Sequence, residues 1–206
     1  MSSSDEDDYS GKLEYNPLLH GGKRKSAFLP YKPTNTVLTN LQRGNTEANI
    51  SNEICLSFHE KTGQGEITEE QVSSYIHIVN ALDSKQLTPL HWACYYGQLQ
   101  SVNILIKYGA DVNKLAPDMI SPLLLAAAGG HHEIVRKLLQ YKVDVNHMDI
   151  IGNTALMYAA AGNHPHTCYE LIQKSADVTL TNEDGDTAYI IALRNNANLA
   201  QTVIEN

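Results

Sequence analysis

The sequence lacks an apolar run long enough to cross a membrane, and it has few cysteines. A spanning helix needs about 20 consecutive apolar residues, and no stretch of the 206 residues approaches that length. Residues 1–8 are polar and acidic, whereas a signal peptide begins with a basic segment followed by an apolar one. The three cysteines, Cys55, Cys94 and Cys168, form no CxxC pair, which favours packing thiols in a reducing compartment. We therefore expect an intracellular protein without membrane insertion.

Basic charge is scarce in the larger part of the chain. Residues 1–43 carry six Lys or Arg against five Asp or Glu, whereas residues 44–206 carry nine against eighteen. Such an acidic region repels the phosphate backbone of nucleic acids. We therefore expect no direct nucleic-acid binding by residues 44–206, although a protein partner can bind DNA.

The first fifty residues have no hydrophobic periodicity and are rich in Ser, Asn, Thr, Pro and Gly. This composition predicts a disordered N-terminal tail over residues 1–50. The tail contains a short basic cluster, Lys23-Arg24-Lys25. The cluster is either part of a nuclear import signal or a solvated charge run, because three residues fall short of a full basic stretch. Nuclear and cytoplasmic locations therefore both stay open.

A repeat of 33 residues occupies the rest of the chain. Four related hexapeptides begin at residues 88, 121, 154 and 187, and the first reads Thr-Pro-Leu-His-Trp-Ala. An Asp-Val-Asn or Asp-Val-Thr triplet keeps the same period from residues 111, 144 and 177. A third landmark has the same 33-residue period and occurs at Gly97, Gly130, Asn163 and Asn196. This position is expected to need a left-handed backbone at a helix end. Glycine and asparagine are the residues that tolerate that conformation.

A 33-residue period with Thr-Pro-Leu-His-x-Ala is the signature of ankyrin repeats. It predicts an all-α ankyrin-repeat solenoid over residues 53–206, in which each repeat is a helix, a turn, a second helix and a projecting finger. About five repeats are expected, at 53–82, 83–115, 116–148, 149–181 and 182–206. The first is degenerate, with Leu56-Ser57-Phe58-His59 in place of Thr-Pro-Leu-His and Gly65 in place of Gly97. Degenerate first and last repeats are expected, because their outer faces meet water.

Candidate catalytic groups are few and coincide with positions of the repeat. His131-His132-Glu133 resembles an acid–base or metal cluster, but it lies where ankyrin repeats carry a Gly-His-x-Glu start of the outer helix. His59 and His91 occupy the repeat's own His position, where the ring bonds to backbone. We found no Ser/His/Asp order, metal-ligand spacing or phosphate-binding glycine loop. We therefore expect a non-enzymatic protein with no cofactor and no metal.

Apolar and aromatic residues recur at the inner-helix position that follows the repeat's His. That position faces the concave groove of an ankyrin stack, and it holds Trp92, Leu125, Tyr158 and Ile191. Tyr95 lies three residues after Trp92, and the fingers add Leu87, Ile120 and Ile150. A solvated face does not need such a stripe, which favours a peptide-binding groove. The alternative is that some of the rings pack on neighbouring repeats.

The chain resembles a narrow family within the ankyrin proteins. Residues 37–45, read as Val-Leu-Thr-Asn-Leu-Gln-Arg-Gly-Asn, and the degenerate first repeat with Gln64-Gly65-Glu66-Ile67 carry the resemblance. Further along the chain it rests on Trp92, Tyr158-Ala159, Gly162-Asn163-His164, Gln201 and Val203-Ile204-Glu205-Asn206. They resemble the ankyrin-containing subunit of the regulatory factor X complex and ankyrin repeat family A protein. The resemblance covers roughly residues 37–206.

The resemblance implies an adaptor linked to transcription that binds Pro-x-Leu-Pro-x-Ile/Leu peptides in its groove. Its partners would be a regulatory factor X type DNA-binding protein or a class IIa histone deacetylase; the alternative is a cytoplasmic scaffold that binds a membrane-receptor tail. Trp92 and Tyr158 match groove aromatics of the family, and Asp149 matches an acidic finger residue. Ile150 stands where the family has a Trp, and Asp186 and Ile190 replace a Tyr and an Asp.

Overall fold

The helices of the chain are arranged in pairs. In the computed structural model, residues 57–74 and 76–205 are described, and within them five inner helices alternate with five outer helices along the chain. The inner helices are α2 (Phe58–Gln64), α4 (Pro89–Tyr96), α6 (Pro122–Ala128), α8 (Ala155–Ala161) and α10 (Ala188–Arg194). The outer helices are α3 (Glu69–Ser74), α5 (Leu99–Lys107), α7 (His132–Leu138), α9 (Pro165–Gln173) and α11 (Asn198–Glu205).

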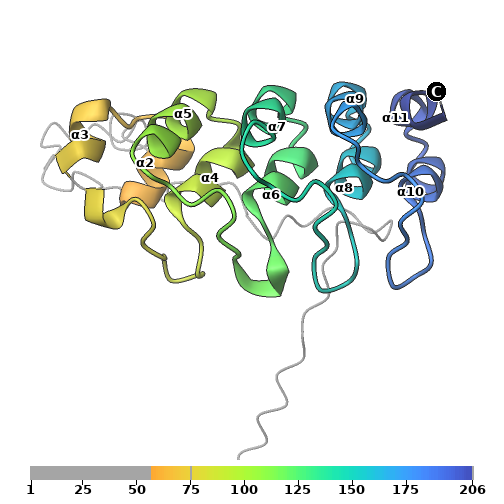
Figure 1. The fold of residues 1–206 in the computed structure, drawn as a ribbon, viewed down its shortest axis with the longest axis horizontal. Coiled ribbons are helices and arrows are strands. Elements are labelled where there is room, and N and C mark those ends of the chain that lie inside the picture. The colour runs from red at the N-terminus through yellow and green to blue at the C-terminus, as the bar shows by residue number, and fades with distance from the viewer. Residues whose placement is uncertain (1–56, 75, 206) are drawn as a thin grey trace, which may run out of the picture. The chain divides into compact units, whose positions relative to one another are not determined.

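Figure 1 shows the inner and outer helices as two parallel rows, with loops projecting from the side of the inner row. We call these loops fingers; they are centred on residues 83–87, 116–120, 149–153 and 182–186. Two 3-10 turns, η1 (Ile76–Ile78) and η2 (Pro117–Met119), lie in the connections. The described residues contain no strand, and the predicted all-α solenoid is confirmed. The predicted tail, residues 1–50, lies outside the described residues.

A hydroxyl side chain begins each of the four regular inner helices. Ser121 and Thr154 accept hydrogen bonds from the backbone N–H three residues ahead, each at 3.3 Å. Thr88 and Thr187 do the same at 3.4 and 3.3 Å. A side chain that satisfies one of the orphan N–H groups stabilises a helix end by about 1 kcal/mol. The first residue of each hexapeptide is therefore a helix cap.

The first repeat begins its inner helix one residue later than the alignment with Thr88 places it. Ser57 caps α2, and Glu60 completes a capping box by accepting from the Ser57 N–H at 2.8 Å. The alignment puts Leu56 in the capping place, and leucine has no oxygen to accept a hydrogen bond. The serine and glutamate three residues apart therefore decide where the helix begins.

The predicted left-handed positions are confirmed. Gly97 and Gly130 have φ of 76° and 74°, while Asn163 and Asn196 have φ of 56° and 54°. Gly65, at the same place in the first repeat, has φ of 78°. Each of these residues reverses the chain between an inner and an outer helix, so the third landmark of the repeat is a backbone requirement.

The core lies between the two rows of helices and between successive repeats. Its largest fully buried side chains include Leu90, Leu105, Leu123, Leu138, Leu156 and Leu171, which come from both rows. Successive inner helices contact each other along the row from α2 to α10, and successive outer helices do so from α3 to α11. Each repeat therefore completes its core with its neighbours, as stacked repeats do. None of the described helices combines the length and the apolar character needed to span a bilayer.

Histidine side chains bond to backbone carbonyls both within a repeat and between neighbouring repeats. The Nε2 of His91 lies 3.2 Å from the oxygen of Ile120, and that of His59 lies 2.9 Å from the oxygen of Ala81. His131, at the start of α7, similarly lies 3.1 Å from the oxygen of Tyr95. The structural role expected of His59 and His91 is confirmed. Within the described residues, no group of three or more His, Cys, Asp and Glu can hold a metal ion.

Candidate functional site

An Asp or Asn side chain folds three of the four fingers. In the first, Asp83 Oδ1 accepts from the backbone N–H groups of Lys85 and Leu87, at 2.8 and 2.9 Å. Asp149 Oδ1 accepts in the same way from Ile151 and Asn153, at 3.0 and 2.8 Å. Asn182 Oδ1 accepts from residues 184 and 186, at 3.1 and 2.9 Å. These side chains take the place of backbone acceptors in a tight turn.

The second carboxylate oxygen of two of these residues binds an aromatic side chain of the inner helix that follows. Trp92 Nε1 donates to Asp83 Oδ2 at 2.8 Å, and the Tyr158 hydroxyl donates to Asp149 Oδ2 at 2.5 Å. We call Asp83–Trp92 and Asp149–Tyr158 the Asp–ring pairs. The two pairs lie two repeats apart and have the same internal spacing of nine residues. Each joins a finger to the inner helix behind it.

The one repeat between the Asp–ring pairs uses apolar residues at the same positions. Ala116 stands where Asp83 and Asp149 are, and Leu125 stands at the ring position. The finger of this repeat instead has two residues in the left-handed region, Asp118 and Met119, each with φ of 59°. It is supported by the next repeat, because the Ile150 N–H donates to the Asp118 oxygen at 3.1 Å.

An aromatic cluster surrounds Trp92 on α4. The Trp92 and Tyr96 rings stack with centroids 5.8 Å apart, and Tyr95 meets Tyr96 edge-on at 5.0 Å. The cluster lies against α2 at Gly63, where an added Cβ would lie 2.9 Å from Tyr96 Cδ2 and 3.1 Å from Trp92 Cε3. The absence of a side chain at Gly63 therefore lets the first repeat approach the rings of the second.

The residues that the sequence assigned to the groove differ in their exposure. Trp92, Tyr95, Leu125 and Ile120 are half-buried, and Ile150 on the third finger is 49% exposed. Leu87, Asp149 and Tyr158 are buried, with 7%, 6% and 5% of their surface exposed. The half-buried and exposed side chains can meet a partner directly. The buried three instead shape the fingers and the inner helices.

Sequence reasoning missed Asp83 and Tyr96, which belong to the same cluster as Trp92. Asp83 stands two repeats before Asp149, so the period alone was a signal that could have found it. Tyr96 carries no signal from the repeat, because the equivalent residues are Gly129 and Gly162. Its contribution follows from the stacking of its ring on Trp92.

Comparison with known proteins agrees with the repeat geometry. The family model for ankyrin repeats in three copies matches residues 103–182 and 123–206, and the model for a single ankyrin repeat matches residues 85–116. The chain belongs to the ankyrin-repeat family.

The ankyrin chain also has relatives of known name. It is 37% identical over 79 residues to the DNA-binding protein RFXANK of Homo sapiens, a match that covers 37% of this chain and 30% of the relative. It is 37% identical over 90 residues to ankyrin repeat family A protein 2 of Bos taurus, covering 41% of this chain and 27% of the relative. The resemblance drawn from the sequence is thus confirmed, and the matched segment spans about a third or less of each relative.

The distal end of the ankyrin stack carries a second polar network. Asp186 is buried on the last finger and forms an ion pair with Arg194 of α10. The Asn182 amide donates to Asn153 Oδ1 at 3.0 Å, which joins the last two fingers. The buried Asp186 carboxylate is therefore paired within the chain.

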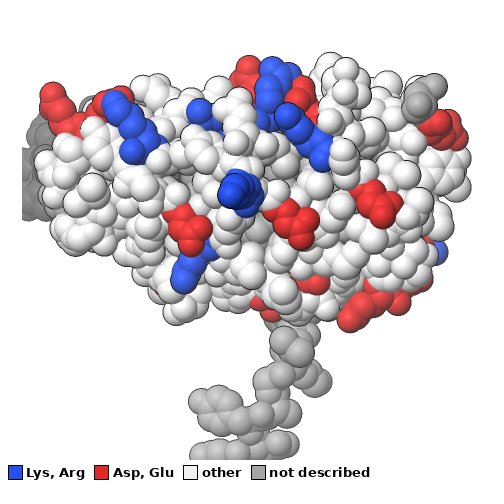
Figure 2. Space-filling model, viewed as in Figure 1, with Lys and Arg blue, Asp and Glu red and all other residues white. Residues whose placement is uncertain are grey.

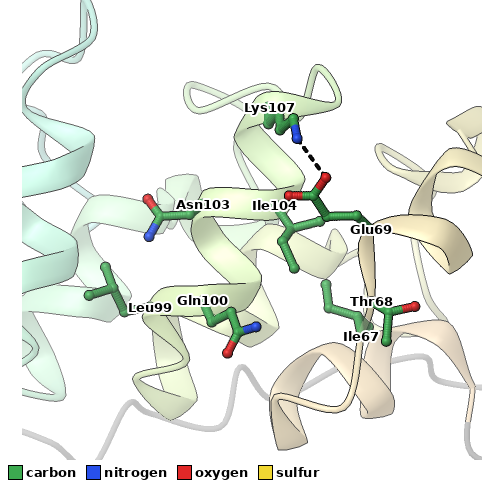
Figure 3. A pocket seen from close by; sticks show the side chains of 8 residues that line it. All are labelled: Ile67, Thr68, Glu69, Leu99, Gln100, Asn103, Ile104 and Lys107. Atoms are coloured by element: carbon green, nitrogen blue, oxygen red, sulfur yellow. Dashed lines mark hydrogen bonds and ion pairs between the residues drawn. The ribbon is translucent and has the colours of Figure 1, made fainter.

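A hollow of about 490 Å³ lies on the other side of the ankyrin stack, between α5 and residues 67–69. Figure 3 shows the ion pair of Glu69 and Lys107, at 2.5 Å, at one edge, with Ile67 and Ile104 among the lining side chains. Its remaining lining residues are Thr68, Leu99, Gln100 and Asn103. The hollow includes no residue of the fingers or inner helices, so it is separate from the residues that the sequence assigned to a groove.

The surface charges of the ankyrin stack are mixed in sign (Figure 2), and its two described cysteines are buried. Figure 2 shows acidic and basic side chains interspersed on one face of the described residues, without a continuous basic track. Cys94 and Cys168 are buried and unpaired, and burial raises the pKa of Cys168 to about 12. Burial also raises the pKa of the Cys94 thiol. Because the thiolate is the nucleophile, both residues serve as packing groups at neutral pH.

Proposed function

We propose that the chain is a non-enzymatic adaptor that holds an extended, proline-containing peptide across the inner helices of its second to fourth repeats. The observation that carries this proposal is the aromatic cluster of Trp92, Tyr95 and Tyr96, half-buried or exposed at the junction of a finger and an inner helix. Leu125 on α6 and the fingers at Ile120 and Ile150 continue the apolar surface. Aromatic anchors of this kind dominate the energy of protein interfaces.

Proline suits such a surface for a physical reason. It lacks a backbone donor and fixes an extended chain, so little conformational entropy is lost on binding. Its ring packs on the faces of Trp and Tyr side chains, as in other proline-recognising grooves. We infer a peptide of the Pro-x-Leu-Pro-x-Ile/Leu form, which the family resemblance implies.

The relatives suggest a cellular setting for this adaptor. One of them is named a DNA-binding protein, and the resemblance implies a regulatory factor X type DNA-binding protein or a class IIa histone deacetylase as partner. We propose a transcription co-regulator in the nucleus that bridges such factors. The alternative is a cytoplasmic scaffold on a membrane-receptor tail. Imaging of the tagged chain with and without Lys23–Lys25 separates the two locations.

The peptide proposal is tested with Trp92→Ala and a labelled Pro-x-Leu-Pro-x-Leu peptide in a fluorescence anisotropy titration. Removing a buried aromatic anchor costs roughly 2 kcal/mol or more, which is about a thirtyfold loss of affinity. The control is Tyr141→Ala, because Tyr141 is 40% exposed and lies outside the fingers and helices. Wild-type affinity in Trp92→Ala, with the helical circular dichroism signal intact, would refute the groove assignment.

A further inference from the structure

We propose that Asp83 and Asp149 are positioning residues of the groove, each fixing one finger and one ring with the two oxygens of a single carboxylate. This inference rests on the proposed peptide groove and assigns different roles to its repeats. The second and fourth repeats hold their rings in place before a partner arrives. The third repeat, with Ala116 and Leu125 at the same positions, adapts by packing alone.

The geometry of the two Asp–ring pairs is the first support. In both, Oδ1 accepts from two backbone N–H groups of the finger, while Oδ2 accepts from the ring nine residues later. A carboxylate has two acceptor oxygens, so one residue can serve both tasks. The finger and the ring then move together, because each is bonded to the same planar group.

The other repeats of the same chain supply an internal comparison. Asn182 occupies the Asp position of the last repeat, and its single oxygen is used by the finger turn. Its amide nitrogen is a donor and bonds to Asn153. The ring position of that repeat is Ile191, which has no donor. Acid residues at this position therefore occur where the inner helix carries Trp or Tyr, and Ala or Asn where it carries Leu or Ile.

This arrangement has a consequence for the partner. Asp149 is buried, and both of its oxygens accept hydrogen bonds from the chain itself. A cationic side chain of the peptide does not need to pair with it. The groove at Asp149 then recognises the apolar side chains and prolines of the peptide, so binding depends only weakly on salt.

Asp83→Asn in the full 206-residue chain separates the turn from the ring contact. The asparagine oxygen can keep the finger turn, as Asn182 does, while the indole N–H of Trp92 loses its acceptor. Trp92 is the single tryptophan of the chain, so its emission spectrum and its indole ¹⁵N–¹H signal report on this contact directly. We expect a shifted indole signal, faster indole hydrogen exchange and about tenfold weaker binding of the Pro-x-Leu-Pro-x-Leu peptide.

The control substitution is Lys85→Ala, on the exposed tip of the same finger, which should leave both the indole signal and the affinity unchanged. In a Trp92→Phe background, Asp83→Asn should weaken peptide binding no further, because the donor is already gone. An unchanged indole signal in Asp83→Asn overturns the proposal, and so does wild-type affinity despite a shifted signal. If the wild-type chain binds no such peptide, the proposed function fails, and the indole signal alone decides whether Asp83 fixes the ring.

Discussion

The Tyr158 hydroxyl donates a 2.5 Å hydrogen bond to Asp149, and both side chains are buried where the third finger meets α8. The pair repeats the Asp83–Trp92 contact two repeats further along the chain. In each case the carboxylate precedes the ring by nine residues. A finger and an inner helix are thus joined by the same kind of hydrogen bond in the second and fourth repeats.

The first prediction concerns the energy of the buried pair. Tyr158→Phe leaves an Asp149 oxygen buried without its donor, which should cost about 1–3 kcal/mol of unfolding free energy. Tyr158→Phe combined with Asp149→Asn should cost less than the sum of the two changes, because both remove the same hydrogen bond. Urea unfolding measures each variant. Tyr189→Phe is the control, since the Tyr189 hydroxyl bonds Glu205 on the exposed surface; additive costs would contradict the prediction.

The second prediction concerns the core between the repeats. Leu138 of α7 is fully buried, so Leu138→Ala removes packed methyl groups and should destabilise the stack by about 2–5 kcal/mol. Leu199 of α11 is 60% exposed, and Leu199→Ala should change the stability by less than about 0.5 kcal/mol. Thermal unfolding, monitored by circular dichroism, compares the Leu138→Ala and Leu199→Ala variants. Equal shifts in Tm would count against the assigned core.

The third prediction explains the change from glycine to asparagine along the repeats. A Cβ at Gly130 would lie 2.5 Å from Nδ1 of His164, which belongs to the next repeat. The residue equivalent to His164 one repeat later, next to Asn163, is Ala197. The small alanine leaves room for Asn163, whose Oδ1 accepts from the Ala200 N–H at 3.1 Å.

We therefore expect Gly130→Asn to destabilise the chain although asparagine tolerates a left-handed backbone. The added side chain must displace the His164 ring, which lies 3.3 Å from the Ala128 oxygen through Nε2. Adding His164→Ala should recover part of the loss by removing the clash. The measurement is the unfolding free energy of both single variants and the double variant, and no recovery in the double variant would show that the histidine is not the obstacle.

The fourth prediction is a pH dependence that arises from His91. Burial lowers the pKa of His91 to about 4 from its ordinary value of 6.5. Its Nδ1 accepts from the Thr88 N–H at 3.3 Å, so Nε2 carries the proton and donates to the Ile120 oxygen. Protonation of Nδ1 would remove the acceptor for the Thr88 N–H, while the bond from Nε2 to Ile120 would remain. The native state therefore binds fewer protons than the unfolded chain between these two pKa values.

The stability contributed by a neutral His91 should be fully present above pH 6.5 and lost as the pH falls toward 4. The loss is roughly 3 kcal/mol over that window. In NMR titrations the His91 ring should stay neutral at pH 5.5, while His91→Gln should flatten the pH dependence of urea unfolding. His166→Gln, at an exposed position on α9, is the control. A His91 ring that titrates near 6.5 in the folded chain would rule out His91 as the source of this pH dependence.

Local features of the chain could be read correctly from the sequence. The hydroxyl caps at Thr88 and Ser121 act on an N–H three residues away, and the left-handed positions at Gly97 and Asn163 depend on the conformation of one residue. Such features need no neighbour to form, so the 33-residue period was sufficient to predict the solenoid. The choice of Trp92 as a candidate groove residue followed from the same period.

Other features depended on which side chains the stacking brings together. The sequence alone could not place Tyr158 and Asp149 in a buried pair, or show that Gly63 makes room for the rings of the next repeat. Nor could it show why this left-handed position is glycine at Gly130 but asparagine at Asn163 in the next repeat. Burial and hydrogen-bond partners at these sites are set by residues of a neighbouring helix or repeat, many of them about 30 residues away. The sequence by itself therefore determined the fold, while the tertiary structure decided which of its aromatic and acidic residues stay exposed and which are buried and hold neighbouring elements together.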